Sequence, residues 1–147
     1  MSEHRATLPP VLSEPDFVKM LSWEVQRATR YQDFLSVGLI LPAGETGFLS
    51  AETRESVGRL FAEFLRASDV VGTIEQMLGV LLVHTPLSDA TSIVQRVQQR
   101  IEEGATGPRG ASPARVRLSL GLACFPTDAT DDVQLIAVAR SRVGHVP

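Results

Sequence analysis

The chain has 147 residues, of which 44% are hydrophobic and 21% charged, and its formal net charge is −3 at pH 7. This length suits one globular domain of about 100–200 residues and is too short for two. The composition excludes a wholly disordered or fibrous chain, and the small negative charge argues against a general nucleic-acid binder, which needs a positive field to collect phosphates.

Neither a membrane span nor an export signal is visible in the sequence. The longest purely apolar runs, such as residues 80–83, are far shorter than the roughly 20 residues that cross a bilayer. The N-terminus also lacks the basic and then apolar pattern of a signal peptide. The single cysteine, Cys124, excludes an internal disulfide and a multi-cysteine metal site, and it fits a reducing compartment. We therefore expect a soluble, cytoplasmic protein.

The first 12 residues contain two adjacent prolines and no periodic apolar pattern, which predicts a flexible lead followed by a single domain over residues 13–147. Ser13 and the proline and acidic residues directly after it have the composition of a helix start. A helix to about residue 30 is predicted because apolar residues then recur at helical spacing. These residues are Phe17, Leu21, Val25 and Ala28.

The middle of the chain alternates between strand and helix patterns. The apolar run over residues 34–41 predicts a buried strand, and apolar spacing over residues 50–67 predicts a second helix. Two further apolar runs, 69–74 and 77–84, are separated by Glu75 and Gln76 alone, so we expect a β-hairpin. Neither residue of that turn favours a positive φ.

The last third continues the alternation. Ser88 and Asp89 are predicted to cap a third helix that ends near residue 103, and residues 104–114 have the composition of a loop. Alternating apolar residues from Val116 predict a half-buried strand, and the spacing over residues 131–143 predicts a final helix. Without its outer helices, this order is β-α-β-β-α-β. The predicted fold class is therefore α/β (α+β), with a ferredoxin-like antiparallel sheet that carries the two inner helices on one face.

Three segments, placed on these elements, resemble the GGDEF family of diguanylate cyclases. The first is the pattern F-x-x-x-L-x-x-E-x-x-R-A-x-R-Y-x-x-x-L-S-V, from Phe17 to Val37. The second is R-x-x-D, formed by Arg66 and Asp69, followed by two valines and the hairpin. The third is LSLGLACFPTDATDDVQLIAVA over residues 118–139. The resemblance implies the nucleotide-cyclase variant of the ferredoxin-like core, in agreement with the element order.

The same resemblance implies that this chain is degenerate. Cyclases of the family join two GTP molecules across a homodimer, with carboxylates that hold divalent cations. The family's metal-binding aspartate at the end of the first strand is replaced here by the run 41–43, Leu-Pro-Ala. At the signature hairpin both glycines are missing, Gln76 and Met77 fill the acidic positions, and we interpret Glu75 as a solvated turn residue.

Two further family features are also absent. The guanine-recognising segments have no counterpart, and the Ala-Asp pair of the last helix becomes Ala139 and Arg140. The resemblance therefore implies no catalytic residue, no metal site and no cofactor, and we expect that the chain is not an enzyme.

The R-x-x-D pair survives, and in the family it binds cyclic di-GMP. Its arginine can fork onto a guanine edge or a phosphate, and its aspartate can accept from guanine N–H groups. Arg96, on the third helix, is the candidate for a second arginine of this site. A structural role is the alternative, since Arg66 would complement the end of a helix and Asp69 would make an ordinary turn.

Met20 and Trp23 lie off the apolar stripe of the first helix, so they are candidates for a partner surface or for a cover over a loop edge. The leading hypothesis is a catalytically inactive GGDEF-like domain that serves as a protein-interaction or regulatory module in bacterial signalling. The partner would be another signalling protein or a second copy of the chain, with no nucleic acid and no membrane involved. A cyclic di-GMP receptor is the alternative, and an active cyclase ranks last.

Overall fold

The computed structural model describes residues 10–44, 47–48, 51–103 and 117–144. Within these ranges it contains four helices and one five-stranded sheet. The helices are α2 (Glu14–Tyr31), α3 (Ala51–Phe64), α4 (Leu87–Glu102) and α5 (Asp132–Arg142), and the strands are β1 (Leu35–Gly44), β2 (Gly47–Phe48), β3 (Val70–Ile74), β4 (Met77–Val83) and β5 (Arg117–Phe125). The order agrees with the sequence prediction, except that β2 is a short strand where a loop was expected.

The sheet has the predicted ferredoxin-like arrangement. β1 lies in the centre and pairs antiparallel with β4 on one side and with β5 on the other. β3 pairs antiparallel with β4 and forms one edge, and β2 pairs with the end of β1. Among the described helices, none is long and apolar enough to cross a membrane.

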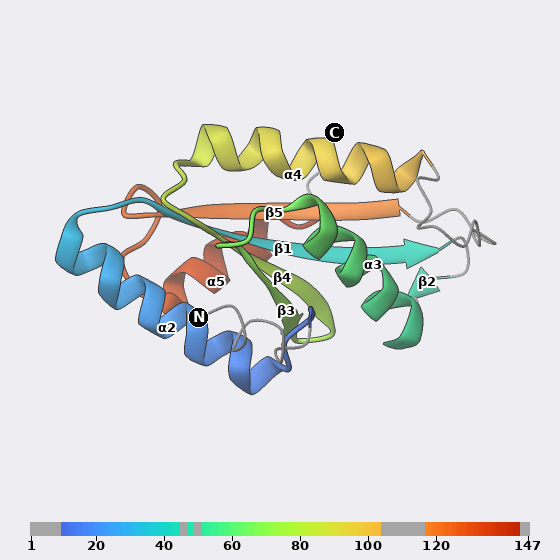
Figure 1. The fold of residues 1–147 in the computed structure, drawn as a ribbon, viewed down its shortest axis with the longest axis horizontal. Coiled ribbons are helices and arrows are strands. Elements are labelled where there is room, and N and C mark those ends of the chain that lie inside the picture. Colours follow the sequence, from blue (N-terminus) through green and yellow to red (C-terminus); the bar gives the residue numbers. More distant parts are fainter. Residues whose placement is uncertain (1–9, 45–46, 49–50, 104–116, 145–147) are drawn as a thin grey trace.

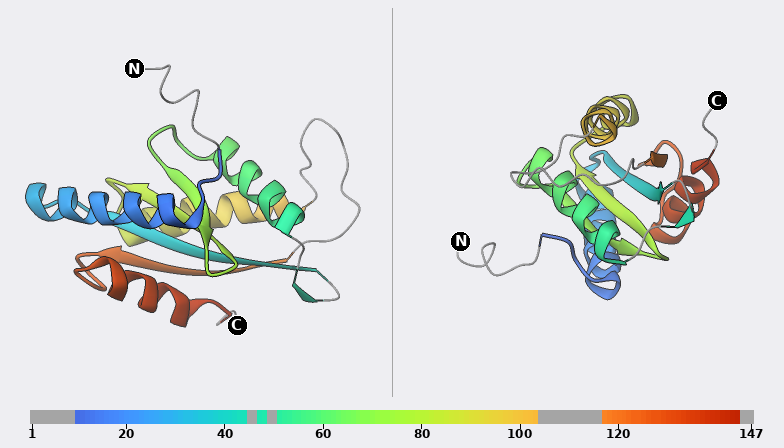
Figure 2. Two further views of the ribbon diagram at one scale, coloured as in Figure 1. Left: turned by 90° about the horizontal axis from the view of Figure 1, so that it is seen from below. Right: turned by 90° about the vertical axis from the view of Figure 1, so that its right-hand side faces the viewer.

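The helices cover both faces of the sheet (Figure 1). α3 and α4 pack on one face, while α2 and α5 lie together on the other, as the view from below shows (Figure 2). Alternation along β1 supplies both layers: Leu35, Val37 and Leu39 join the core of α2 and α5, whereas Ile40 joins the core of α3 and α4. The two inner helices thus share one face, as predicted, and the two outer helices complete the second layer.

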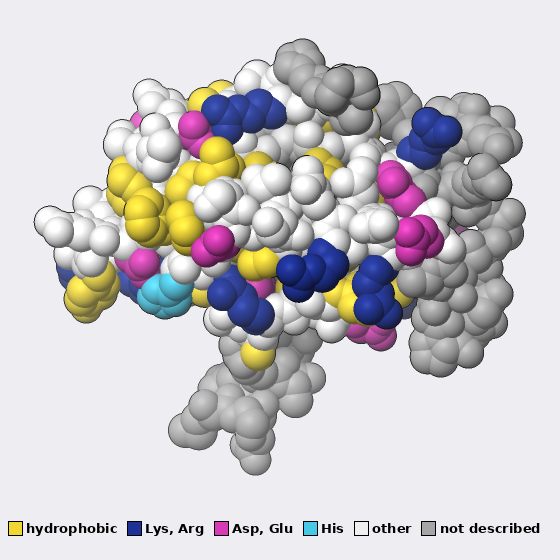
Figure 3. Space-filling view, turned by 90° about the horizontal axis from the view of Figure 1, so that it is seen from above, with side chains coloured by type: hydrophobic (Ala, Val, Ile, Leu, Met, Phe, Trp, Pro, Cys, Tyr) yellow, Lys and Arg dark blue, Asp and Glu magenta, His cyan; other side chains and the backbone are white. Residues whose placement is uncertain are grey.

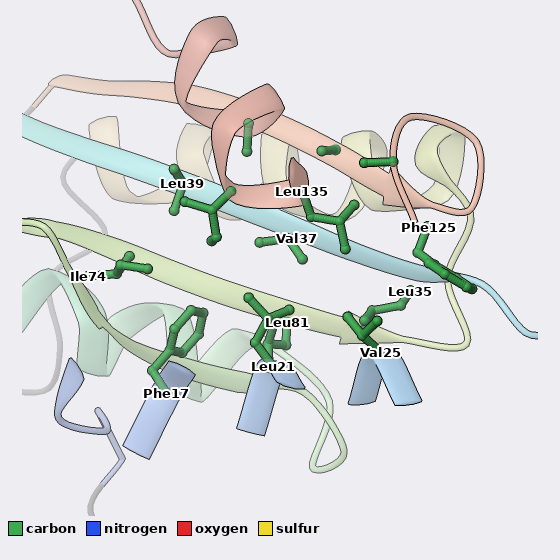
Figure 4. Close-up of a cluster of buried hydrophobic side chains, with 14 of the residues drawn as sticks. Phe17, Leu21, Val25, Leu35, Val37, Leu39, Ile74, Leu81, Phe125 and Leu135 are labelled. Atoms are coloured by element: carbon green, nitrogen blue, oxygen red, sulfur yellow. The ribbon is translucent and has the colours of Figure 1, made fainter. Parts of the chain in front are cut away.

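Helix α2 begins as the sequence predicts. Ser13 is its N-cap and its hydroxyl accepts from the backbone N–H of Asp16 at 3.4 Å, which satisfies one of the donors left free at a helix start. All four predicted apolar residues of the helix are buried. The close-up shows the side chains of Phe17, Leu21 and Val25 pointing from α2 toward the sheet (Figure 4).

The residues just before α2 cover the edge of the sheet. Leu12, the last residue of the predicted lead, is buried, and its N–H donates to the carbonyl of Val71 at 2.9 Å. Its own carbonyl accepts from the N–H of Thr73 at 3.0 Å. Residues 1–9 of the predicted lead lie outside the described residues. Leu12 occupies the peptide groups that an edge strand would otherwise present to another chain.

Phe17 fixes the position of α2 on the β3–β4 hairpin. Gly72 and Gly79 are directly opposite each other in the register of these strands, and the Phe17 ring lies over both. A Cβ atom added to Gly72 or to Gly79 would come within 2.6 Å of a ring atom, closer than side-chain atoms approach one another. The two glycines therefore provide the space that the ring fills.

Two local details differ from the expectations. The prediction that Ser88 and Asp89 cap α4 is wrong: the N-cap is Pro86, whose carbonyl accepts from the N–H of Ala90 at 2.9 Å, and no side chain caps the helix. The proline restricts φ at the helix start and so favours the first turn without a side-chain acceptor. The predicted loop over residues 104–114 and Val116 lie outside the described residues.

The two residues of the hairpin turn adopt an unfavourable backbone conformation, and a hydrogen bond to α2 helps to hold it. Ile74 pairs with Met77, so Glu75 and Gln76 alone connect the strands, and their φ angles are 50° and 68°. A two-residue turn that matches the twist of a hairpin requires positive φ at both positions. The N–H of Glu75 donates to the carboxylate of Glu14 at 2.9 Å, which ties the turn to the start of α2.

Substitution of Gly72 by alanine should destabilise the fold. The added methyl group meets the Phe17 ring at 2.6 Å, and overpacking of this kind costs about 1–3 kcal/mol. Urea unfolding should show the loss. In combination with Phe17→Leu, which removes ring atoms, the G72A cost should shrink, because contacting residues are not additive. Equal stability of wild type and G72A would contradict the close packing described above.

Candidate functional site

A groove of about 600 Å³ opens between α2, the end of α3 and the adjoining ends of β3 and β4. We call it the α2–α3 groove. Its walls combine apolar side chains with the arginine and aspartate of the R-x-x-D pair. The described residues that line the groove include Leu12, Met20, Arg27, Ala62, Arg66 and His84.

Arg66 and Asp69 form a closed pair. The Nε and Nη2 groups of Arg66 donate to the two carboxylate oxygens of Asp69, each at 3.0 Å, which is the forked geometry of a strong arginine–carboxylate pair. The backbone N–H of Arg66 also donates to Asp69, at 3.2 Å. The Asp69 side chain is 0% exposed and that of Arg66 is 50% exposed. The hydrogen bond with Asp69 raises the pKa of Arg66 above its ordinary value.

The same guanidinium reaches the end of β4. Nη2 of Arg66 donates to the carbonyl of Val83 at 3.1 Å and to the hydroxyl of Thr85 at 2.7 Å. Thr85 is buried. Arg66 therefore joins the end of α3 to the segment between β4 and α4, a structural role of the kind that the sequence left open.

Arg96 does not join this pair. It lies on the exposed side of α4, is not among the residues that line the groove, and no described hydrogen bond or ion pair links it to Arg66 or Asp69. One turn further along α4, the guanidinium of Arg100 lies 4.5 Å from the centre of the Phe64 ring. The structure thus does not assemble the predicted three-residue set.

A second polar cluster, which sequence reasoning missed, lies on the α2 side of the groove. Nε of Arg27 donates to Glu24 at 2.8 Å, and Nη1 donates to Asp33 at 3.2 Å. His84 contacts the same Asp33 carboxylate through Nδ1. Glu24 and Arg27 belonged to the family pattern of the first helix, but nothing in the sequence indicated that His84 would meet them.

Charge and hydrogen bonding set the pKa of the Asp33 carboxyl group. Its partial burial opposes ionisation, but hydrogen bonds from the N–H of Phe34 and from Arg27, together with the charges of His84 and Arg27, outweigh this effect. The pKa of Asp33 is therefore lowered. The carboxylate remains a fixed acceptor that holds the end of α2 against the end of β4.

Met20 and Trp23 occupy different positions. Met20 is half-buried, lines the groove and packs against the core. Trp23 is 59% exposed and lies one helical turn from both Met20 and Arg27, because residues three or four apart share a helix face. Trp23 therefore lies close to the rim of the groove.

The β3–β4 hairpin, which the sequence resemblance aligned with the family's signature, makes contacts of its own. Glu75 is not a freely solvated turn residue, as the sequence suggested: Arg140 of α5 donates to its two carboxylate oxygens at 2.9 and 2.5 Å. Met77 is buried in the core, and Gln76 is exposed. Ala139 is also buried. Among the described residues, no group of three or more His, Cys, Asp or Glu side chains is placed to hold a metal ion.

The R-x-x-D pair should be measurable as a stability coupling. Arg66→Gln and Asp69→Asn should each lower the free energy of unfolding by about 1–3 kcal/mol, since each leaves a buried or charged partner unsatisfied. Because each change already removes the pair, the double variant should lose clearly less than the sum of the two. Arg59→Gln is the matched control on α3: its side chain is exposed and its contact with Glu55 is 3.5 Å long, so it should change stability by less than about 1 kcal/mol. Additive losses would show that the fork contributes nothing.

Comparisons with known proteins identify the fold through solved structures. No family model matches the sequence, and no curated protein matches it. Solved structures do match. A DGC protein from Thermotoga maritima has 20% identity and a TM-score of 0.70, with 92% of this chain and 100% of that chain covered.

Two other matches come from GGDEF-type domains. The FimX GGDEF domain from Pseudomonas aeruginosa has 16% identity and a TM-score of 0.74, over 90% of this chain and 86% of that chain. The active GGEEF domain of a diguanylate cyclase from Vibrio cholerae has 13% identity and a TM-score of 0.75, over 90% and 88% of the two chains. The resemblance seen in the sequence is thus confirmed for the fold: this chain has the fold of a GGDEF domain.

Proposed function

We propose that this chain is a catalytically inactive GGDEF-like domain that works in the cytoplasm as a protein-interaction or regulatory module of a bacterial signalling pathway. The observation that carries the proposal is the bidentate ion pair between Glu75 and Arg140 at the turn of the β3–β4 hairpin. It puts a positive charge where a cyclase of this fold needs negative charge.

The chemistry of the hairpin supports an inactive domain. Phosphoryl chemistry on GTP requires carboxylates that are free to hold divalent cations. Glu75 is already neutralised by Arg140, and the neighbouring Met77 offers a buried thioether, which is a poor ligand for a hard cation. The turn also lacks glycine, so side chains stand where a phosphate would need to approach the backbone.

A protein partner is the ligand class that we favour. The diguanylate cyclase SiaD from Pseudomonas aeruginosa, which shares this fold, has been solved in complex with its activator SiaC. That structure supports the idea that a domain of this fold can present a surface to another protein. A second copy of the chain is also a possible partner.

Incubation of the chain with GTP and Mg²⁺ tests the proposal. We expect no dinucleotide product by chromatography, because Glu75 is held by Arg140 rather than by a cation. An active GGDEF domain in a parallel reaction provides the positive control. Formation of a cyclic dinucleotide by the purified chain would overturn the proposed function.

Cyclic di-GMP binding through Arg66 and Asp69 is the second candidate. It is favoured by the groove beside Arg66 and by the structure of DgcB from Caulobacter crescentus, a coiled coil and GGDEF domain in complex with c-di-GMP. It requires the Arg66–Asp69 fork to open, since both oxygens of Asp69 accept from Arg66.

Calorimetry with cyclic di-GMP, on the wild-type chain and on Arg66→Ala, examines this candidate. Because the fork is closed and Asp69 is buried, we expect no heat of binding with either protein. Binding by the wild type that Arg66→Ala abolishes would instead establish the receptor function.

A further inference from the structure

Given the proposed regulatory role, we infer that the α2–α3 groove receives a short acidic segment of a partner protein. The segment presents a carboxylate to Arg66 and an apolar side chain to the floor of the groove. This inference names the partner's chemistry and the residues that recognise it.

The first argument is the layering of charge along the groove. The Arg66 and His84 side chains are the more exposed members of their pairs: Arg66 is 50% exposed and His84 is 63% exposed. Their acidic partners are less exposed, with Asp69 at 0% and Asp33 at 22%. Glu24, which also lines the groove, is 24% exposed and is held by Arg27. The space-filling view shows the side of the molecule seen from above in Figure 1, where basic, acidic and hydrophobic side chains are interspersed (Figure 3). An approaching molecule therefore meets hydrogen-bond donors first, which favours an acidic ligand.

The second argument is donor capacity that the fold leaves unused. Nη2 of Arg27 is buried and has no hydrogen-bond partner among the described residues, although its other nitrogens are bonded to Glu24 and Asp33. A buried donor without an acceptor is unfavourable. Arg66 uses Nε and Nη2 for its described bonds, so its Nη1 edge can face a ligand. A carboxylate in the groove would accept from the Nη1 edge of the half-exposed Arg66 side chain.

The third argument is the apolar floor. Leu12, Met20 and Ala62 line the groove beside these donors, and Val70 and Val71 extend the apolar surface. A thioether such as that of Met20 adapts to differently shaped side chains. The volume of about 600 Å³ lies within the range of about 300–1,000 Å³ that is typical of binding pockets. A ligand that fits must therefore carry an apolar group near its carboxylate, as a peptide does.

A nucleotide fits this surface less well. None of the described residues that line the groove is Phe, Tyr or Trp, so these residues offer no broad aromatic face for a base to stack on. Recognition of a guanine edge also needs a free carboxylate, and that of Asp69 is committed to Arg66. The observations therefore favour a peptide over a dinucleotide.

Peptide selection on the full chain tests the inference. Short peptides randomised at every position are displayed on phage, selected on the immobilised chain, and resynthesised with a fluorescent label for anisotropy titration. We expect enrichment of Asp or Glu close to Leu, Met or Phe. Trp23 is the chain's single tryptophan, and its emission should change on binding because it lies near the rim.

Three variants locate the binding. Arg66→Gln removes the exposed donor, and Met20→Glu places a negative charge on the floor without touching the Arg66–Asp69 fork. Each should weaken binding by about tenfold or more, the effect of losing one charge-assisted contact. Arg96→Gln, an exposed change outside the groove, should leave binding unchanged. Circular dichroism confirms that each variant is folded, and Ala62→Glu replaces any variant that is not.

Several results would overturn the inference. These are the failure to enrich any peptide, enrichment of basic or neutral peptides, and binding that Met20→Glu does not weaken. Weakened peptide binding only in variants outside the groove would also overturn it. So would binding of cyclic di-GMP by a chain that binds no peptide. The GTP assay on the same preparation separates the two proposals, since dinucleotide synthesis would remove the proposed function without changing where peptides bind.

Discussion

The packing of Phe17 over Gly72 and Gly79 is the contact on which the described arrangement depends. Because both glycines lie within touching distance of the ring, α2 can sit on the β3–β4 hairpin in one register only. That register places Glu14 at the hairpin turn and brings Met20 and Arg27 opposite the end of α3. The α2–α3 groove therefore depends on the space that the two missing Cβ atoms leave for the ring, and a change at Gly72 or Gly79 would shift the wall that Met20 and Arg27 supply.

The hairpin turn keeps an uncommon backbone conformation because two helices hold it. A positive φ at Glu75 and Gln76 is uncommon for residues with side chains, and the conformation is held from two sides. Glu14 of α2 accepts from the backbone N–H of Glu75, and Arg140 of α5 pairs with its carboxylate. These contacts link three elements at one point. Their consequence is that the Glu75 carboxylate joins the turn to α5 while its backbone N–H joins the turn to α2.

The sequence could predict the elements but not the contacts between distant ones. Helix α2 was predicted because its apolar residues recur at helical spacing, and strand β1 because its apolar run has the length of a buried strand. The partnership of His84 with Asp33 joins residues about fifty positions apart, for which spacing carries no signal. The cap of α4 was misplaced because Ser88 and Asp89 are good capping residues wherever they occur, whereas Pro86 acts through its restricted backbone. The sequence marked Arg66 and Asp69 as a motif, yet only the fold shows that Asp69 is buried.

The burial of Asp69 decides how the R-x-x-D pattern should be interpreted. A motif defined by two residue types is satisfied equally by a pair that faces a ligand and by a pair that faces itself. Here the two members differ: the side chain of Asp69 is 0% exposed, while half of the Arg66 side chain remains accessible. The aspartate thus orients the arginine and neutralises part of its charge, and the arginine alone faces solvent. The exposed edge of Arg66 offers hydrogen-bond donors only, so the proposed ligand is one that presents negative charge to it rather than the donor and acceptor pattern of a base.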